Sequence, residues 1–253
     1  MKTLFRLFTL ISFSIILLAS CNSKKQNESE NTVPTEEEKA QAVKDVLKQG
    51  LEKATKVLSA ENGFLNNDSL KITLPAEAKG LINNIKRLPQ GEELLNKAIT
   101  QINQAAGSSV DAIAPIISAA IDNMSVEDAN KILSADDAAA TAYLEKLTRE
   151  PLHTACEPVI LKSLDKKIIG DITARSTWMN VAGAYNKMAN TSVGKLASME
   201  PVELNLDGYV TDKMLDAVFY LIAKEEMNIR EHPGARISKS VAKSFGWIDD
   251  NNK

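Results

Sequence analysis

Two adjacent glutamates near the C-terminal end of the chain, Glu225 and Glu226, are the residues whose types and spacing best suit chemistry. Glu225 falls on a stripe of apolar residues that recur at helical spacing, and Glu226 lies beside it. A carboxylate on a buried helix face must find a partner or change its pKa. Arg230 follows Glu226 by four residues, which suits a helical ion pair, and Arg236 follows a Pro-Gly turn and can fold back. The apolar stripe consists of Val218, Ile222 and Ile229.

This group of Glu225, Glu226, Arg230 and Arg236 has two interpretations. Paired carboxylates with arginine partners can bind a ligand or act as a general acid and base. The same residues can instead form a structural ion-pair network. The two interpretations differ in burial, because an acid–base role requires both carboxylates to reach one open pocket, whereas a structural network seals them in salt bridges.

The sequence lacks other patterns of catalysis and metal binding. Its two histidines, His153 and His232, are far apart and neither has metal-ligand spacing, so we expect no metal site. It contains no nucleophile elbow, phosphate-binding loop or dinucleotide-binding glycine pattern, so we expect no cofactor. Lysine and arginine number 30 against 33 aspartates and glutamates, a net charge of −3, which argues against nucleic acid as a partner.

One cysteine and two aromatic residues need separate interpretation. Cys156 lies among Leu152 and Ile160 at helical spacing, which predicts a buried, inert thiol rather than a nucleophile. Trp178 and Tyr185 are seven residues apart and share one helix face between small residues. They either form the wall of a binding groove or pack in the core.

The elements that must position these residues are predicted to be helices. Aromatic residues make up only 5% of the chain, against 44% for all hydrophobic residues, so aliphatic side chains must fill the core, which favours helix packing. Apolar residues recur in steps of three and four through most of the chain, and Thr35 and Glu38 have the spacing of a capping box. We expect an all-α fold, with a single multi-helix domain over residues 36–248 and a disordered tail over residues 249–253.

Two short segments interrupt the helical pattern. Residues 70–74 and 202–206 alternate apolar and polar side chains, which is typical of an extended chain. They either pair with each other as short strands or lie as extended loops packed on helices.

The N-terminal residues carry the pattern of an exported protein. Lys2 and Arg6 precede an apolar run over residues 7–18, which is too short to span a membrane comfortably. The segment that follows, Leu18-Ala19-Ser20-Cys21, resembles the lipobox of bacterial lipoproteins. This resemblance implies that residues 1–20 are a signal peptide, that Cys21 takes a diacylglycerol, and that its new amino terminus is acylated by a fatty acid such as palmitate.

A lipidated Cys21 also implies a location. Residues 21–35 are polar and are expected to form a flexible tether, which would hold the domain on the order of 20 Å from the membrane. Asn22 stands where an aspartate commonly retains lipoproteins at the inner membrane. We therefore expect a protein of the cell envelope, lipid-anchored in the outer membrane and facing the periplasm. With Cys21 lipidated, Cys156 has no cysteine to pair with, so the fold must rest on its core alone.

Several stretches between residues 43 and 246 resemble a bacterial family catalogued as domain of unknown function 4197. Members look like exported helical proteins or lipoproteins, and the family name carries no activity, so the resemblance assigns no functional residue. The matching stretches are Asn62-Gly63-Phe64-Leu65-Asn66-Asn67, Leu70-Lys71-Ile72-Thr73-Leu74-Pro75, Met124-Ser125-Val126-Glu127-Asp128-Ala129, Asp137-Ala138-Ala139-Ala140-Thr141-Ala142-Tyr143-Leu144, Tyr209-Val210-Thr211-Asp212-Lys213-Met214-Leu215-Asp216, and Pro233-Gly234-Ala235-Arg236.

Together these features predict a membrane-anchored, non-enzymatic module that binds another envelope protein or a small ligand. One alternative is an envelope hydrolase that acts on wall or lipid components through Glu225 or Glu226. Another is a purely structural envelope protein.

Overall fold

The computed structural model describes residues 33–253, apart from residues 88, 136–137 and 252–253. The predicted signal peptide, Cys21 and most of the predicted tether lie outside the described residues. The unit Val33–Lys253 is compact and is described by itself.

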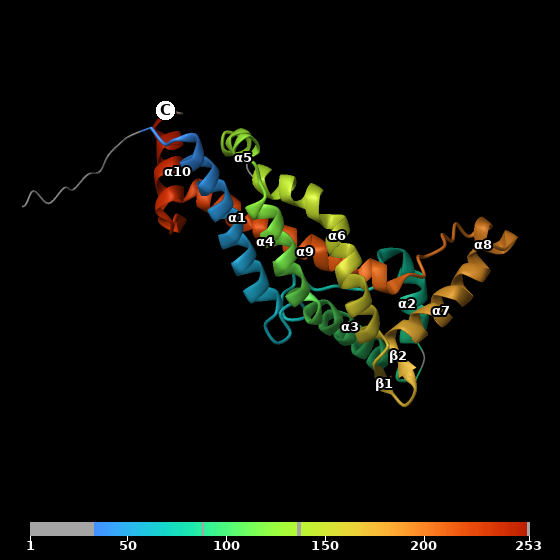
Figure 1. Cartoon of the computed structure of the whole chain (residues 1–253). Helices are drawn as coiled ribbons and strands as arrows, with labels where there is room; N and C mark the ends of the chain where they lie inside the picture. The colour runs from blue at the N-terminus through green and yellow to red at the C-terminus, as the bar shows by residue number, and fades with distance from the viewer. Residues whose placement is uncertain (1–32, 88, 136–137, 252–253) are drawn as a thin grey trace, which may run out of the picture. The chain divides into compact units, whose positions relative to one another are not determined.

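The described residues fold into a mainly helical domain, as the sequence predicts (Figure 1). The longer helices are α1 (Glu36–Leu58), α3 (Gly91–Ser108), α6 (Ala139–Leu164), α7 (Ala174–Ala189), α9 (Leu206–Glu231) and α10 (Lys239–Asn251). The shorter helices are α2 (Lys79–Lys86), α4 (Ile113–Asp122), α5 (Val126–Leu133) and α8 (Ser192–Leu196), with 3-10 turns η1 (Ala76–Ala78), η2 (Val110–Ala112) and η3 (Pro233–Ala235).

Helix α9 forms the centre of the core. It packs along α6 and α1, and α1 in turn packs against α4, α5 and α10 (Figure 1). Each long helix buries aliphatic side chains from one face, for example Leu47 of α1, Leu152 of α6 and Ile222 of α9. Cys156 of α6 is fully buried among them, and its thiol approaches the carbonyl oxygen of Ser109 at 3.9 Å.

The capping box predicted at the first helix is present. The Glu38 amide donates to the Thr35 hydroxyl at 3.2 Å, and the Thr35 amide donates to the Glu38 carboxylate at 2.9 Å. Pro34, directly before this cap, is already buried. Helix α1 begins at Glu36, the first residue of the predicted domain, with Thr35 as its N-cap.

The first of the two extended segments is held by a side chain instead of a strand. Ile72 is buried, and its amide donates to Oδ1 of Asn103 on α3 at 2.9 Å. Nδ2 of the same asparagine donates back to the Ile72 carbonyl oxygen at 2.8 Å. One amide side chain thus satisfies both backbone groups of Ile72, as a neighbouring strand would.

The second extended segment is held in the same way. Asn186 on α7 accepts from the Val202 amide and donates to the Val202 carbonyl oxygen, both at 2.8 Å. The alternative of extended loops packed on helices is therefore confirmed, and the predicted pairing of the two segments as strands is wrong. Residue 206 was also assigned to the second segment, but Leu206 begins α9.

The one sheet in the described part of the chain lies elsewhere. Strands β1 (Lys167–Ile169) and β2 (Ile172–Thr173) form a short antiparallel hairpin between α6 and α7. Gly170 in its turn has a φ of +56°, a left-handed conformation that glycine adopts without strain. Beneath the hairpin, Gln101 of α3 donates to the carbonyl oxygens of Ser163 at 3.1 Å and Lys166 at 2.6 Å, and accepts from the Ala174 amide at 3.1 Å. Gln101 thereby joins the end of α6 to the start of α7.

The C-terminal boundary predicted at residue 248 is also wrong. Helix α10 runs through Gly246 to Asn251, so residues 249–251 are helical and only residues 252–253 of the predicted tail lie outside the described part. The extension is stabilised by Asp249, whose carboxylate accepts from Arg236 at 2.7 Å.

Within the described residues, the segment Gly91–Asp122 is long and apolar enough to cross a membrane by length and composition alone. It comprises α3, η2 and α4, which pack against α6. Its Ile102, Ile113 and Ile117 are fully buried in the core, and 39% of its most apolar 18-residue stretch is buried within the domain.

Candidate functional site

Three of the four charged residues singled out by the sequence, Glu226, Arg230 and Arg236, bind backbone groups at helix ends. Glu226 is completely buried, and its carboxylate accepts hydrogen bonds from the amides of Ala140 at 3.1 Å and Thr141 at 2.8 Å, and from the Thr141 hydroxyl at 2.7 Å. These amides belong to the first turn of α6, whose own N-cap residue, Ala138, has no side chain that could cap it. Glu226 therefore caps α6 from the neighbouring helix, where the helix dipole favours a negative charge.

Arg230 connects Glu226 to the C-terminal end of α5. Its Nη2 donates to Glu226 at 2.9 Å and its Nε at 3.1 Å. The guanidinium also donates to the carbonyl oxygens of Ile132, Leu133 and Ala135, at and just beyond the end of α5, over 3.3–3.4 Å. The positive charge thus lies at a helix C-terminus and the negative charge at a helix N-terminus.

Arg236 likewise binds carbonyl groups at the C-terminal end of α9. It donates to the carbonyl oxygens of Ile229 at 3.0 Å and Arg230 at 2.8 Å, in the last turn of that helix. The guanidinium groups of Arg230 and Arg236 lie 5.4 and 5.7 Å from the ring centroid of Phe245 on α10. Arg236 therefore secures α10 against α9.

Glu225 points to the other side of α9. It is nearly buried and pairs with Lys53 of α1, and it accepts from Nε2 of Gln49 at 2.9 Å. Gln49 also donates to the Ala235 carbonyl oxygen at 3.2 Å. Both carboxylates are thus enclosed by protein partners and line none of the cavities described below, which is the arrangement expected of a structural network and not of an acid–base pair.

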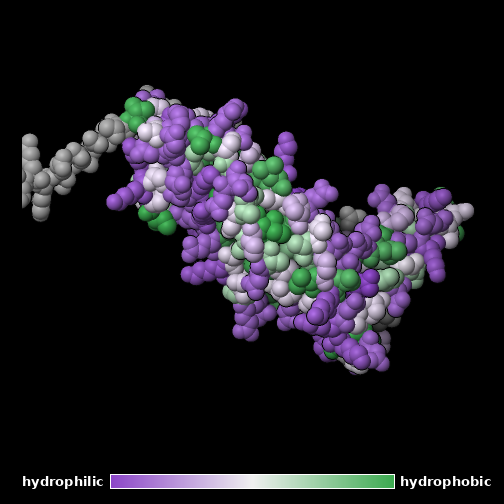
Figure 2. All heavy atoms as spheres, in the orientation of Figure 1, coloured by the Kyte–Doolittle hydropathy of each residue, from purple (hydrophilic) through white to green (hydrophobic). Residues whose placement is uncertain are grey.

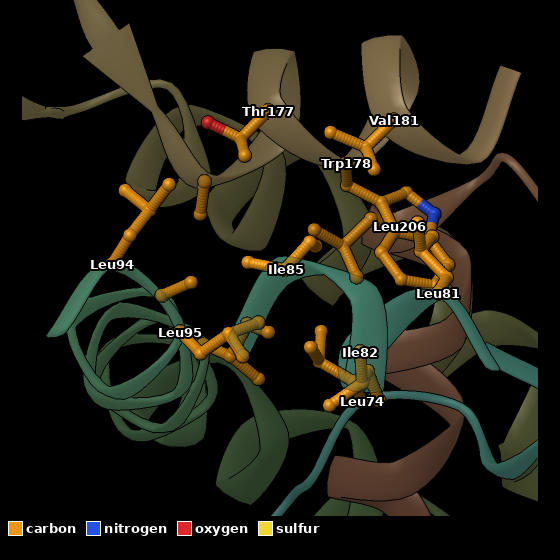
Figure 3. Close-up of a pocket in the computed structure, with 13 residues that line it drawn as sticks. Leu74, Leu81, Ile82, Ile85, Leu94, Leu95, Thr177, Trp178, Val181 and Leu206 are labelled. Carbon is orange, nitrogen blue, oxygen red and sulfur yellow. The ribbon is translucent and has the colours of Figure 1, made fainter. Parts of the chain in front are cut away.

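An apolar cavity between α2, α3 and α7 is the strongest candidate for a binding site (Figure 3). Helix α2 contributes Leu81, Ile82 and Ile85, whose side chains point between the other two helices. The enclosed space is about 30 Å³, and its walls are apolar except for the hydroxyl of Thr177 and the indole N–H of Trp178. The remaining lining residues are Leu74, Leu94, Leu95, Ala98, Ile102, Ala174, Trp178, Val181 and Leu206.

Trp178 forms a fixed wall of this cavity. Its indole nitrogen donates to the carbonyl oxygen of Glu203 at 3.0 Å, next to the Val202 segment that Asn186 holds. The sequence left open whether Trp178 and Tyr185 line a groove or pack in the core. Trp178 does both, because it is buried and lines the cavity, whereas Tyr185 is partly buried against the core and is not among the lining residues.

A larger and more polar groove lies beside the cavity. It encloses about 450 Å³ and shares Leu74, Ile82 and Leu95 with the cavity, so these side chains separate the two spaces. Lys79 and Lys86 of α2 also line the groove. The other lining residues are Thr73, Pro75, Ala76, Asn83, Glu92, Asn96 and Ile99.

Helix α2 is attached to the domain by apolar contacts. Leu81 is its one buried residue, and across the described part of the molecule no side-chain hydrogen bond or ion pair connects Lys79–Lys86 to another element. Neither end of α2 has a side-chain cap. Its last turn closely approaches α3, since a β-carbon on Gly91 would lie 1.8 Å from the Ile85 carbonyl oxygen.

The apolar residues of α2 and α3 follow the helical periodicity found through most of the chain, and nothing in the sequence separates them from the core. The sequence feature that could have indicated the site is the shortness of α2, whose eight residues carry apolar side chains on one side only. Helices α7 and α8 also expose large apolar residues, among them Met179, Val193 and Leu196, while the face in Figure 2 is otherwise mostly hydrophilic with small apolar groups.

Among the described residues, no group of three or more His, Cys, Asp or Glu side chains is arranged to hold a metal.

Comparison with known proteins gives one match. The family model described as "Protein of unknown function (DUF4197)" matches residues 33–246, which is almost the whole described domain. No curated protein and no solved structure matches the chain. The chain therefore belongs to the DUF4197 family of proteins of unknown function.

Proposed function

We propose that this protein is a lipid-anchored component of the bacterial cell envelope whose helical domain is a non-enzymatic binding module. The observation that carries the binding role is the apolar cavity between α2, α3 and α7, which has a rigid aromatic wall at Trp178 and one weakly attached side at α2. Apolar cavities with few polar groups are the usual sites for small ligands, and this one, at about 30 Å³, has to widen at α2 to hold one. Its lining supports binding more than catalysis, because the only polar side-chain groups there are the Thr177 hydroxyl and the indole N–H of Trp178, which already donates to Glu203.

The proposed anchor rests on the pattern of Lys2 and Arg6, the apolar run and Leu18-Ala19-Ser20-Cys21. A cell expressing the chain should incorporate labelled palmitate into it, and the protein should sediment with membranes. The Cys21→Ser variant should lose the label and leave the membrane fraction after detergent-free lysis. A Cys156→Ser variant is the control and should keep both properties. Palmitate incorporation that persists in Cys21→Ser would contradict the anchor.

The cavity can be tested with a neutral dye that fluoresces in apolar surroundings, N-phenyl-1-naphthylamine. Residues 33–253 should bind the dye, since this compact unit contains all the residues that line the cavity. Ala98→Val fills the cavity and should weaken binding, whereas Leu95→Ala enlarges it and should strengthen binding. Ala119→Val, on the exposed face of α4, is the control for adding the same side chain to a helix. Equal binding by all four proteins would exclude the cavity as the site.

A further inference from the structure

We propose that the cavity and the adjoining groove together bind a long-chain fatty acid, with the hydrocarbon chain between α2, α3 and α7 and the carboxylate beside Lys79 and Lys86. This inference rests on the proposed binding function and names the chemistry of the ligand. Three features of the molecule support it: the two spaces adjoin, the groove carries positive charge, and α2 is weakly held.

The cavity and the groove are neighbours of opposite character. The walls of the cavity are aliphatic and aromatic, whereas the groove is lined by amides and charged groups as well as apolar residues. Leu74, Ile82 and Leu95 belong to both, so rotation of these side chains would join the two spaces. A ligand that filled both would need an apolar part and a polar part at one end, which defines an amphiphile.

The charge of the groove selects an anion. Lys79 and Lys86 are seven residues apart on α2, so both lie on the same side of the helix as Ile82. Both are exposed, and neither forms an ion pair with any residue that the structure describes. Glu92 is the one acidic residue among the groove's lining, so the groove carries a net positive charge. Two unpaired ammonium groups above an apolar cavity complement a carboxylate head with a hydrocarbon tail.

Entry of the chain requires α2 to move. A space of about 30 Å³ holds little more than a water molecule, so a chain must displace Leu81 or Ile85 outward. Helix α2 can respond because apolar contacts alone hold it, and the same contacts can be remade with a methylene chain. Each methylene buried in this way should tighten binding up to about fourfold, until the chain fills the space.

Calorimetric titration of residues 33–253 with dodecanoate, 1-dodecanol and dodecyltrimethylammonium, each below its micelle concentration, tests the inference. Dodecanoate should bind at least fivefold more tightly than the alcohol, and the cationic amphiphile should bind more weakly than either. The double variant Lys79→Met/Lys86→Met should remove the preference for dodecanoate and leave the affinity for the alcohol within twofold. Lys56→Met/Lys146→Met, which removes the same charge from exposed positions on α1 and α6, is the control and should keep the preference.

The outcomes separate this inference from the proposed function. If dodecanol and dodecanoate bind equally, or if the Lys79→Met/Lys86→Met variant keeps its preference for the carboxylate, the fatty acid assignment is overturned while the apolar site stands. If neither these amphiphiles nor the neutral dye binds, both the assignment and the proposed binding function are overturned. Circular dichroism and cooperative unfolding of each variant verify that it is folded.

Discussion

At the scale of single residues, the buried charges of this protein are placed where helix backbones leave polar groups without partners. Glu226 accepts hydrogen bonds from the free amides at the start of α6. Arg230 and Arg236 donate to the last carbonyl groups of α5 and α9. The sequence predicts the pair Glu226–Arg230 from its spacing of four residues. It cannot predict the partners on α6, because Thr141 lies 85 residues away from Glu226 in the chain.

Replacing Glu226 by glutamine should destabilise the domain strongly. The substitution keeps the shape of the side chain but places an NH2 group among donors and leaves the largely buried Arg230 guanidinium without its counter-charge. Loss of one partner from a buried pair usually costs about 3–5 kcal/mol in the free energy of unfolding. Urea denaturation followed by circular dichroism measures this loss.

Two comparisons make the Glu226→Gln result specific. Glu127→Gln breaks an exposed ion pair with Lys131 and should leave the urea midpoint unchanged. Glu226→Gln/Arg230→Met should be less destabilised than the sum of its two single variants, because the lone buried charge is removed as well. A Glu226→Gln protein as stable as the parent would contradict the capping role.

Cys156 should make stability depend on pH in the alkaline range. Burial raises the pKa of its thiol from an ordinary value of 9.0 to about 11. The folded protein therefore keeps a proton that the unfolded chain releases, so the free energy of unfolding falls as the pH rises from about 9 to 11. Between pH 8 and pH 10.5 the parent should lose about 2 kcal/mol relative to Cys156→Ala, which has no thiol to titrate. Parallel pH profiles for the two proteins would show that the thiol is not shielded.

At the scale of elements, asparagine side chains replace the strand that the alternating sequence pattern led us to expect. The alternation in residues 70–74 and 202–206 correctly predicts an extended backbone with one face inward. The alternation does not predict which groups form hydrogen bonds with that backbone. Asn103 and Asn186 lie on helices, and the apolar pattern of those helices does not single them out. A two-residue contact between an amide side chain and a backbone leaves no periodic signal in the sequence.

The two asparagines should differ in their contribution to stability. Asn103 and Ile72 are buried, so Asn103→Ala leaves an amide and a carbonyl group without partners and should cost about 2–4 kcal/mol. The bonds of Asn186 are only partly buried, so water can replace them and Asn186→Ala should cost about 1 kcal/mol. Thermal and urea unfolding of the two variants, side by side, test this ranking, and a larger cost for Asn186→Ala would contradict it.

Glycines on either side of the α2–α3 junction offer a matched pair of substitutions. A β-carbon on Gly91 would lie 1.8 Å from the Ile85 carbonyl oxygen, so Gly91→Ala must push α2 away from α3. Gly80, inside α2, has no neighbouring atom within 4 Å of the same position, so Gly80→Ala should stabilise α2 by about 0.5–1 kcal/mol through helix propensity. We expect Gly91→Ala to lower the melting temperature and to change the affinity for the naphthylamine dye, and Gly80→Ala to do neither. Dye binding unchanged in Gly91→Ala would contradict the position assigned to the site.

At the scale of the whole molecule, apolar periodicity predicts the helical architecture well and its boundaries less well. The stripe of α1 is a strong signal because this helix buries one face along its length, whereas α9 is buried toward both α1 and α6. The boundary at residue 248 is wrong because α10 continues to Asn251 and Asp249 pairs with Arg236, a tertiary contact that local patterns do not record. Apolar periodicity cannot predict the cavity, since the residues that line it are apolar like those of the core.

The distribution of contacts predicts an uneven distribution of local stability. Helix α9 packs along both α1 and α6 and is joined to them by Glu225 and Glu226, whereas α2 relies on Leu81 and two partly buried isoleucines. Backbone amides of α2 should therefore exchange with deuterium much faster than those of α6 and α9, because a local opening of α2 disrupts few contacts. Exchange followed by mass spectrometry on peptides covering residues 76–87 and 206–231 measures this difference. Saturating dodecanoate should slow exchange in the first peptide and leave the second unchanged. Equal protection of the two peptides in the free protein would show that α2 belongs to the rigid core, and the cavity would then have no way to admit a chain.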